Sequence, residues 1–470
     1  MSRRIFGPAV VAAIATAAFL VPAGAGAEVT PLSIIGPGTS GGAAGQFKQP
    51  TGLAIDSSSG TIVVADKYNG RIAEYTPGGT FIRAFGEGVA GGAGLEVCTT
   101  TCVAGIYGGG AGELYAPTDV ALDSSGLIYV SDTYNNRISV FTQAGTFVRA
   151  FGWDVIDGAA PNSGLQVCTS ATGCQQGTNN ETGAGAINKA RGVDIGPDGN
   201  VWVADQNNHR IDVFTPAGGF VRTFGWGVQD GGLALQTCTS GCQAGIGGAK
   251  AGQLSAPRNV SLDADTVYVA EGQNNRISEF TPAGAFIRAF GWDVIDTTPP
   301  GTGPQVCTTI TGCQVGASGA GAGQFNNAYA VLSNGAGLVY AADVSNNRIN
   351  VFTKAGAFVK TFGWGVSDAT PAFQICTAAC QAGSPGLGAG QMKNPEGLAF
   401  DCRGGLWVGD QDNYRLQRFG EPGTPLAPCP PAAAPAGPTG KRAAALKKCK
   451  KKHSKKKRKK CRKRAKKLPV

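Results

Sequence analysis

One short phrase recurs six times in this chain of 470 residues, and that recurrence limits the possible fold more than any other feature. It reads SDTYNNRISVF at 131–141, and its relatives begin at positions 65, 204, 270, 342 and 409. Self-similarity at a period of about 70 residues is typical of propellers and solenoids, whose units bury their apolar surface against one another. The acidic residues of the six copies are Asp66, Asp132, Asp205, Glu271, Asp343 and Asp410.

Each unit carries four short β-type runs separated by turn residues. In the second unit they are PTDVALD (117–123), LIYVSD (127–132), RISVF (137–141) and TFVRAFG (146–152). Such runs, bounded by Gly, Asn and Asp turns, predict a four-stranded antiparallel meander. A single meander cannot bury both faces, whereas six arranged radially can. We therefore predict an all-β fold: a six-bladed β-propeller of four-stranded antiparallel blades.

The two ends of the repeat region each supply part of one blade. The sixth unit, 394–423, provides three strands and then stops, whereas EVTPLSIIG (28–36) aligns with the outermost strand of the other units. We expect the N-terminal strand to complete blade six and close the ring. Closure of this kind removes an open sheet edge that would otherwise invite aggregation.

The shared pattern P-x-G-(V/L)-A-(I/L)-D, followed by (I/L)-Y-V-(A/S)-D-x-x-N-N-R-I-x-V-F and G-x-F-(V/I)-R-x-F-G, resembles the NHL repeat over about 28–420. The resemblance implies a six-bladed propeller that mostly binds other macromolecules, namely protein and, in some intracellular members, RNA. It also implies a sensor or adhesion role in some bacterial extracellular members. Some relatives carry a ubiquitin-ligase RING, but this chain has no such Cys/His array.

The two ends of the chain differ from the repeat region in composition. Residues 1–27 read as an export signal with a small-residue cleavage site, so we predict an exported bacterial-type protein, extracellular or associated with the cell envelope. Residues 421–440 form a Pro/Ala-rich linker. The predicted disordered tail, 441–470, holds 18 of the 41 Lys and Arg residues and no acid, so the body 28–440 has 21 basic against 31 acidic residues.

Long inserts follow the fourth strand of five units, and each contains a close pair of cysteines. We predict local disulfides, because one body histidine, His209, is too few for structural zinc. Cys402 and Cys429 are predicted to tie the C-terminus to blade six, and Cys449 and Cys461 to pair or cross-link chains. The five insert pairs are Cys98–Cys102, Cys168–Cys174, Cys238–Cys242, Cys307–Cys313 and Cys376–Cys380.

The repeated Asp and Arg favour a scaffold over a catalytic site, because a catalytic device is needed only once. We expect Arg137 to form a bidentate pair with Asp132, while Asn135 and Asn136 are residue types that tolerate the positive φ of a tight turn. The inserts and these turns should share one face of the disc. We predict no catalytic residues and no metal ligands.

Positions that differ between repeats are better candidates for ligand binding. Each innermost strand begins with a variable slot that should lie at the mouth of the channel on the insert-bearing face. Trp153, Trp226, Trp292 and Trp364, which open four inserts, either pin each insert to its blade or stack on a sugar or partner. The candidate binding residues are Thr51, Thr118, Asp119, Arg191, Arg258, Asn259, Tyr329 and Glu396.

These observations predict an exported, monomeric, non-enzymatic interaction module without a cofactor. Its unidentified ligand is a protein or a glycopolymer, and the tail would hold it at anionic envelope polymers. Two alternatives stay open. One is a calcium-dependent propeller lactonase or lyase, since six-bladed relatives of that kind hold a metal in the channel. The other is a secreted binder of polyanions or, without sequence specificity, nucleic acid, acting through the tail.

Overall fold

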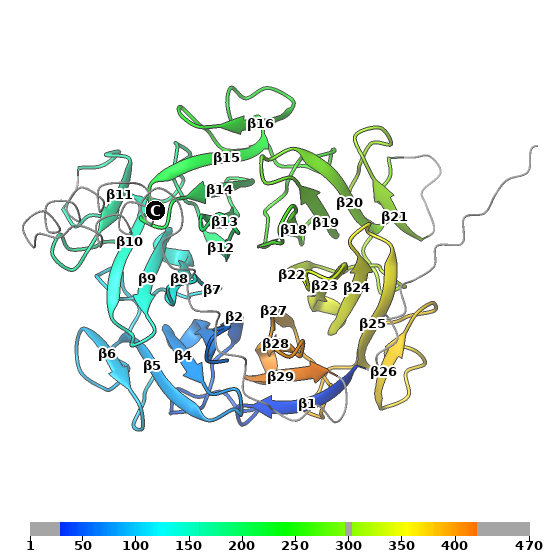
Figure 1. Ribbon diagram of the computed structural model, residues 1–470, viewed down its shortest axis with the longest axis horizontal. Coiled ribbons are helices and arrows are strands. Elements are labelled where there is room, and N and C mark those ends of the chain that lie inside the picture. Colours follow the sequence, from blue (N-terminus) through cyan, green and yellow to red (C-terminus); the bar gives the residue numbers. More distant parts are fainter. Residues whose placement is uncertain (1–28, 159, 297–302, 421–470) are drawn as a thin grey trace, which may run out of the picture.

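The computed structural model describes residues 29–158, 160–296 and 303–420, which form six antiparallel sheets around a central opening (Figure 1). In each sheet the strands follow one another in chain order from the centre outward, apart from blade six, where the N-terminal strand takes the outer place. The predicted six-bladed propeller is confirmed. The predicted leader, linker and tail lie outside the described residues.

Blades one to three are built from consecutive strands, and the turns after their second strands contain short 3-10 helices in blades one and two. Their bounds are β2 (Pro50–Ile55), β3 (Ile62–Asp66), η1 (Lys67–Asn69), β4 (Arg71–Tyr75), β5 (Phe81–Glu87) and β6 (Leu95–Cys98); β7 (Val120–Leu122), β8 (Leu127–Asp132), η2 (Thr133–Asn135), β9 (Arg137–Thr142), β10 (Phe147–Trp153) and β11 (Leu165–Cys168); β12 (Ala190–Ile195), β13 (Val201–Asp205), β14 (Arg210–Phe214), β15 (Phe220–Trp226) and β16 (Leu235–Cys238).

Blades four and five repeat this order, and blade six combines the two ends of the described chain. Their bounds are β17 (Asn259–Leu262), β18 (Val267–Glu271), β19 (Arg276–Phe280), β20 (Phe286–Trp292) and β21 (Pro304–Cys307); β22 (Ala328–Ser333), β23 (Leu338–Asp343), η3 (Val344–Asn346), β24 (Arg348–Thr353), β25 (Phe358–Trp364) and β26 (Phe373–Cys376); β27 (Pro395–Phe400), β28 (Leu406–Asp410), η4 (Gln411–Asn413), β29 (Arg415–Gly420) and β1 (Thr30–Ile35).

Ring closure follows the prediction from the two partial ends. Strand β1 pairs antiparallel with β29, from Thr30 opposite Gly420 to Ile35 opposite Leu416. Figure 1 shows the first strand lying against the last, at the bottom of the ring. The N-terminal strand therefore occupies the outer position in blade six.

Five blades have one strand more than the sequence predicts. The additional strands β6, β11, β16, β21 and β26 come from the inserts, and each consists of four residues that end at the first cysteine of a pair. In blade one, Cys98 lies opposite Ala84 of β5. The insert thus returns along the outer strand and pairs with it, which covers that sheet edge. Blades one to five are therefore five-stranded, and blade six keeps four strands.

The core lies between neighbouring blades, where aromatic residues alternate around the ring. Phe85 of blade one meets Phe141 of blade two at 5.2 Å between ring centroids, and the same contact recurs at each later junction up to Phe362 and Phe419. At the junction where the ring closes, Ile35 of β1 shares a core cluster with Tyr75 instead. The repeated FG and VF segments of the sequence therefore hold the blades together.

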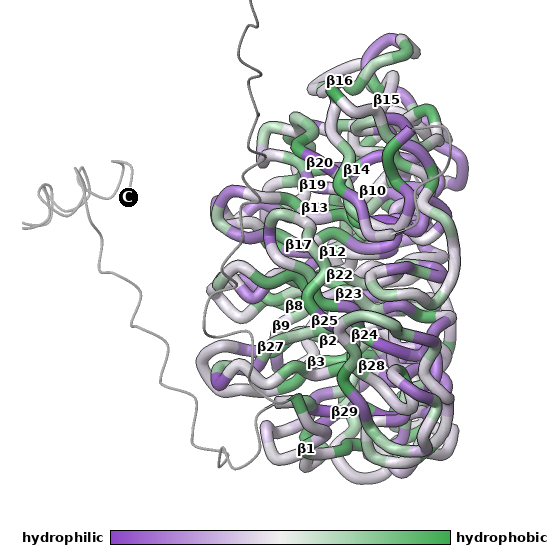
Figure 2. The backbone as a smooth tube through the Cα atoms, turned by 90° about the vertical axis from the view of Figure 1, so that its right-hand side faces the viewer, coloured by the Kyte–Doolittle hydropathy of each residue, from purple (hydrophilic) through white to green (hydrophobic). Residues whose placement is uncertain are grey.

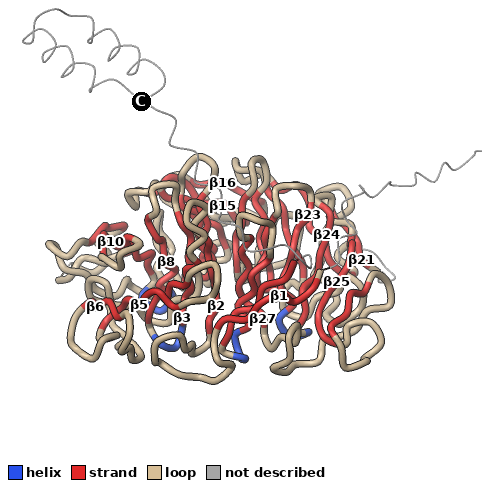
Figure 3. The backbone as a smooth tube through the Cα atoms, turned by 60° about the horizontal axis from the view of Figure 1, so that its bottom comes forward, coloured by secondary structure: helices blue, strands red, loops and turns tan. Residues whose placement is uncertain are grey.

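The inserts and the turns after the second strands share one face of the disc, which we call the insert face. Figure 3 shows the blue helical turns together along this face. Backbone hydrogen bonds join insert to turn in blades one to five, for example from Gly177 N to Asn135 O at 2.8 Å. The edge-on view in Figure 2 shows the disc with polar loops on its outer surfaces and apolar segments within the blades.

Candidate functional site

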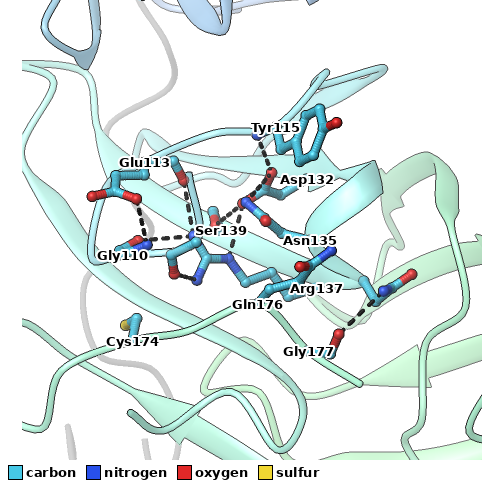
Figure 4. A network of polar contacts seen from close by, with 12 residues as sticks. Gly110, Glu113, Tyr115, Asp132, Asn135, Arg137, Ser139, Cys174, Gln176 and Gly177 are labelled. Carbon is cyan, nitrogen blue, oxygen red and sulfur yellow. Dashed lines mark hydrogen bonds and ion pairs between the residues drawn. The ribbon is translucent and has the colours of Figure 1, made fainter. Parts of the chain in front are cut away.

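The recurring Asp–Asn–Arg unit is a buried framework. In blade two, the Nε of Arg137 donates to Asp132 at 2.9 Å, and both side chains are fully buried (Figure 4). Asn135 donates to the same carboxylate, and Asn136 takes the left-handed φ of 49° that ends the helical turn. The same ion pair forms in all six blades, so the unit supports the fold at every position.

The expected bidentate pairing of Arg137 with Asp132 is wrong. Only Nε bonds to the carboxylate, whereas the two terminal nitrogens donate to backbone carbonyls of the two inserts that flank the blade. These carbonyls belong to Gly109, Gly110 and Glu113 on one side and to Gln175 on the other. The guanidinium therefore ties consecutive inserts to the blade, because loops without regular structure leave carbonyls that need donors.

The cysteines and tryptophans of the inserts also act locally. The structure joins each of the five predicted insert pairs by a disulfide. Cys402 is disulfide-bonded as well, while Cys429, Cys449 and Cys461 lie outside the described residues.

The Trp153 ring packs against the backbone of Gly183, and Trp292 packs against Gly321 in the same way, which agrees with pinning of the inserts. Trp226 instead lines a shallow groove on the rim with Leu233 and Phe286.

The central channel contains a cavity of about 220 Å³ lined by the innermost strands of all six blades. Seven of the eight candidate binding residues line it, and the eighth, Thr51, is fully buried beside it. The variable slots therefore converge at the channel, as their place in the repeat suggests. The binding role of these residues stays a prediction.

Four of the eight candidates are bonded mainly to neighbouring blades. The Thr118 hydroxyl donates to the carbonyl of Arg191 at 2.9 Å, and the Thr51 hydroxyl lies 3.5 Å from the carbonyl of Pro117 at the start of blade two. Asp119 accepts the backbone N–H groups of Val120 and Val193 and the side-chain amide of Asn259, each at 3.0 Å. These groups link blades and narrow the channel, and they offer fewer free atoms to a ligand.

The other four candidates meet at the end of the channel on the insert face. Arg191 comes from blade three, Arg258 from blade four, Tyr329 from blade five and Glu396 from blade six. Arg191 donates to the Tyr329 hydroxyl at 3.0 Å, and the Arg258 guanidinium lies 5.6 Å from the centroid of the Tyr329 ring. We call these four residues, together with Lys67, the channel mouth.

Two residues that were not predicted from the sequence, Lys67 and Gln206, also belong to this site. Both are the first residue after the repeated Asp, a position that turns toward the channel. Gln206 accepts a hydrogen bond from Arg191 Nε at 2.7 Å, and Lys67 interacts electrostatically with Glu396. The signal was present, because this position also varies between repeats: Lys67, Thr133, Gln206, Gly272, Val344 and Gln411.

The channel mouth has more positive than negative charge. Three cations, Lys67, Arg191 and Arg258, surround one carboxylate, Glu396, and no ion pair within 4.0 Å joins them among the described residues. Burial raises the pKa of Glu396, while Lys67 and the arginines oppose that rise. Burial lowers the pKa of Lys67. The mouth can therefore hold an anionic group close to three donors.

Deeper in the channel, two buried carboxyls have raised pKa values. Burial raises the pKa of Asp119 to about 7 and that of Asp194 to about 6. Asp194 accepts the backbone N–H groups of Ile195 and Leu262, both at 2.8 Å. Like Asp119, it reaches from its own blade to the next, so each carboxyl is used as a hydrogen-bond acceptor between blades.

The residues around the channel do not fit a calcium ion. Calcium requires six to eight oxygen ligands, usually including several carboxylates. Across the described parts of the chain, no group of three or more His, Cys, Asp or Glu side chains is placed to hold a metal ion. Asp119 and Asp194 already bond to backbone N–H groups. The calcium-dependent lactonase or lyase alternative therefore has no ligand set in this part of the chain.

The architecture defines the class of the molecule as a six-bladed β-propeller. The family model described as "NHL repeat" matches residues 47–75, 114–141 and 188–214, which cover the inner strands of blades one to three. These three segments match the NHL repeat, and the described residues as a whole form a six-bladed β-propeller.

Solved structures with a related overall arrangement include both enzymes and a binding protein. Virginiamycin B lyase from Staphylococcus aureus aligns at 12% identity and a TM-score of 0.39, covering 84% of this chain and 99% of that one. A gluconolactonase from Xanthomonas campestris gives 12% identity, a TM-score of 0.40 and coverages of 84% and 96%. An auxiliary nutrient binding protein from Bacteroides thetaiotaomicron aligns at 13% identity and a TM-score of 0.41, covering 83% of this chain and 76% of that one. These low similarities do not assign an activity to this chain.

Proposed function

We propose that this propeller is an exported, non-enzymatic binding module that holds an acidic, hydroxyl-bearing group at the channel mouth. The observation that carries the proposal is the set of three cations around one carboxylate at the point where the variable slots of the six blades converge. At the start of each innermost strand, the repeated frame becomes variable and, in three blades, charged. A glycopolymer that carries acid groups has the matching chemistry.

Unused polar atoms at the mouth suggest which groups the ligand presents. Within the described structure, the buried Nε of Arg258 and the buried Oε2 of Glu396 have no hydrogen-bond partner. A buried polar atom without a partner costs free energy, so a ligand that satisfies both gains affinity. A carboxylate or phosphate would accept from Arg258, and a neighbouring hydroxyl would donate to Glu396.

The features around the propeller support an exported and surface-retained protein. Five local disulfides favour an oxidising compartment. No helix in the described ranges is long and apolar enough to cross a membrane. Residues 441–470 supply a dense cationic segment, which would hold the propeller at anionic envelope polymers through attraction that salt weakens.

Titration calorimetry with small acidic sugars tests the mouth. The probes are galacturonate and glucuronate, with galactose and glucose as their neutral counterparts, added to the mature chain. We expect binding of at least one acid, weakened about tenfold or more by Arg258→Ala, because a charge-assisted bond is lost. Lys250→Ala, which removes one exposed cation of the same face away from the channel, should change affinity less than about twofold. Equal losses in both variants would contradict the proposal.

The tail carries a second candidate function, the binding of polyanions, because it combines 18 basic residues with no acid. The test compares single-stranded DNA binding by the mature chain and by a chain that ends at residue 440. Loss of DNA binding with unchanged sugar binding would separate the tail from the mouth. Retention of DNA binding without the tail would reject the tail as its source.

A further inference from the structure

Four tyrosines gather on the insert face between blades one and two, outside the channel. They are Tyr68, Tyr107, Tyr115 and Tyr134, each about two-fifths exposed. The Tyr107 and Tyr115 rings are stacked with centroids 5.0 Å apart, and Tyr115 and Tyr134 follow at 5.1 Å. The Tyr107 hydroxyl donates to the backbone carbonyl of Tyr68 at 2.7 Å. We call this set the tyrosine row.

The row exists in only one sector of a six-fold molecule. The place of Tyr107 in the first insert corresponds to Gly247 and Ser318 in the third and fourth, and that of Tyr115 corresponds to Ser255 and Asn326. The first insert also begins with Glu87 where the other four have tryptophan. Insert one adds exposed Val103 and Ile106 beside the row. The repeat therefore does not require these side chains for folding.

The backbone holds the row in place. The N–H of Tyr115 donates to Asp132 of the buried ion pair at 2.8 Å, and the N–H of Tyr134 donates to the carbonyl of Tyr115 at 3.2 Å. Tyr68 is fixed in the same way by the carbonyl of Lys48 at 3.0 Å. A surface that is already ordered loses little entropy when a partner binds.

We propose that the tyrosine row is a docking surface for a polypeptide segment that combines apolar and acidic side chains. Exposed tyrosines on a rigid support are typical of the central residues of protein interfaces, and contiguous apolar surface on a soluble protein marks an interaction site. The Tyr107 and Tyr115 rings stack, and the Tyr134 ring lies tilted at 36° against Tyr115. These three rings therefore cover part of one another's faces, which a base or sugar would need for stacking. This arrangement favours a polypeptide over a nucleic acid.

Charges at the two ends of the row indicate the acidic part of the partner. The Nζ of Lys67 lies 5.1 Å from the centroid of the Tyr68 ring, and the Nζ of Lys189 lies 5.4 Å from that of Tyr134. An acidic side chain beside either ring would meet an ammonium group that the row already positions. Lys189 is the more accessible of the two, because Lys67 is only 8% exposed.

A displayed library of random dodecapeptides, selected against the mature full-length chain, tests this surface. We expect selected peptides rich in aromatic or aliphatic residues together with Asp and Glu. The test variant is Tyr115→Ser/Tyr134→Ser, and Tyr134→Ser alone serves where the double variant unfolds. The matched control is Ile310→Ser/Leu387→Ser, which removes two exposed apolar side chains from inserts four and five. All variants keep the cationic tail, so attraction of the peptides to the tail cancels in the comparison.

The selected peptides should bind the tyrosine variants about tenfold or more weakly and the control less than about twofold. Lys189→Gln should weaken only the peptides that carry Asp or Glu. Equal binding to the tyrosine and control variants overturns the proposal, as does the absence of any enriched sequence. Oligothymidylate and polygalacturonate are run in parallel. Loss of either with the tyrosine variants, without loss of peptide binding, would reassign the row to a nucleic acid or a glycan.

Discussion

Each of the six blades contributes one buried Asp–Arg pair and one residue slot at the channel. The pair stays constant from blade to blade, whereas the residue in the slot changes. The pair keeps its chemistry at every blade, with Glu271 as the single change of acid, and each arginine donates to an acid and to insert carbonyls. The slot at the mouth holds four residue types in six copies, and four of those side chains meet one another. Within one repeat, the fully buried pair is therefore constant, and the slot that lines the channel is variable.

This difference separates two kinds of constraint on a repeat. A guanidinium with no access to solvent must have every donor satisfied, so each blade reaches the same solution. The slot side chains that line the channel share no such common set of bonds, so each blade is free to differ. Substitutions at the two kinds of position should therefore differ in their cost to the free energy of unfolding.

The largest effect is expected from removal of a buried arginine. Arg137→Ala leaves the carboxylate of Asp132 buried without its cation and leaves insert carbonyls without donors. Breaking a buried pair from one side costs about 3–5 kcal/mol. Urea denaturation followed by tryptophan fluorescence should show this loss in the free energy of unfolding. A loss below about 1 kcal/mol would mean that the constant positions do not carry the fold.

A second test concerns the reach of the insert disulfides. Cys98→Ser/Cys102→Ser opens a loop of about five residues, which costs about 2 kcal/mol in the loop-entropy model. Since both cysteines lie in one insert, the effect should stay local, and hydrogen exchange should accelerate in 88–106 but not in blades three to six. Acceleration in distant blades would show that the inserts stabilise the ring as a whole.

Much of the architecture could be predicted because the repeat fixes it. The count of six blades follows from six copies of one phrase, and closure by β1 follows because two partial ends make one blade. The insert disulfides follow from cysteines four or six positions apart. These features depend on local sequence and on the period, both of which are visible in a single chain.

Other features depend on contacts that the sequence does not show. The fifth strands are four-residue runs such as LEVC, too short to separate from a loop by alternation, and only pairing with the outer strand makes them β. The expected bidentate pair failed because the carbonyls of two distant inserts compete for the guanidinium of Arg137. Lys67 was missed because a turn residue can face either solvent or the channel until the ring closes.

Blade three offers a substitution that should stabilise the molecule. There Asp212 joins Asp205 beside Arg210, whereas blades two and four have Ser139 and Ser278 at that position. Burial and the neighbouring Asp212 raise the pKa of Asp205 well above its usual range. Asp212→Ser removes a buried like charge and should raise the free energy of unfolding at neutral pH by about 1–2 kcal/mol.

The pH dependence of the free energy of unfolding shows whether charge causes the stabilisation by Asp212→Ser. Because the pKa of Asp205 is raised on folding, the folded state keeps a proton that the unfolded state releases above about pH 4. The stabilising contribution is therefore complete below that pH and is lost as the pH rises toward the folded-state pKa. The advantage of Asp212→Ser should grow over this interval in urea titrations at several pH values. A constant advantage would indicate improved packing rather than relief of charge.

The smallest effect is expected at the mouth. Arg258 lies beside Tyr329, and no ion pair with a carboxylate within 4.0 Å is formed by it in the described structure. Arg258→Ala should therefore change the free energy of unfolding by less than about 0.5 kcal/mol, as is usual for substitutions away from the core. It should even stabilise slightly, because burial lowers the pKa of Arg258 and Arg191 repels it. If the variant instead loses as much stability as Arg137→Ala, the mouth is part of the framework, and variation between repeats no longer marks a binding site.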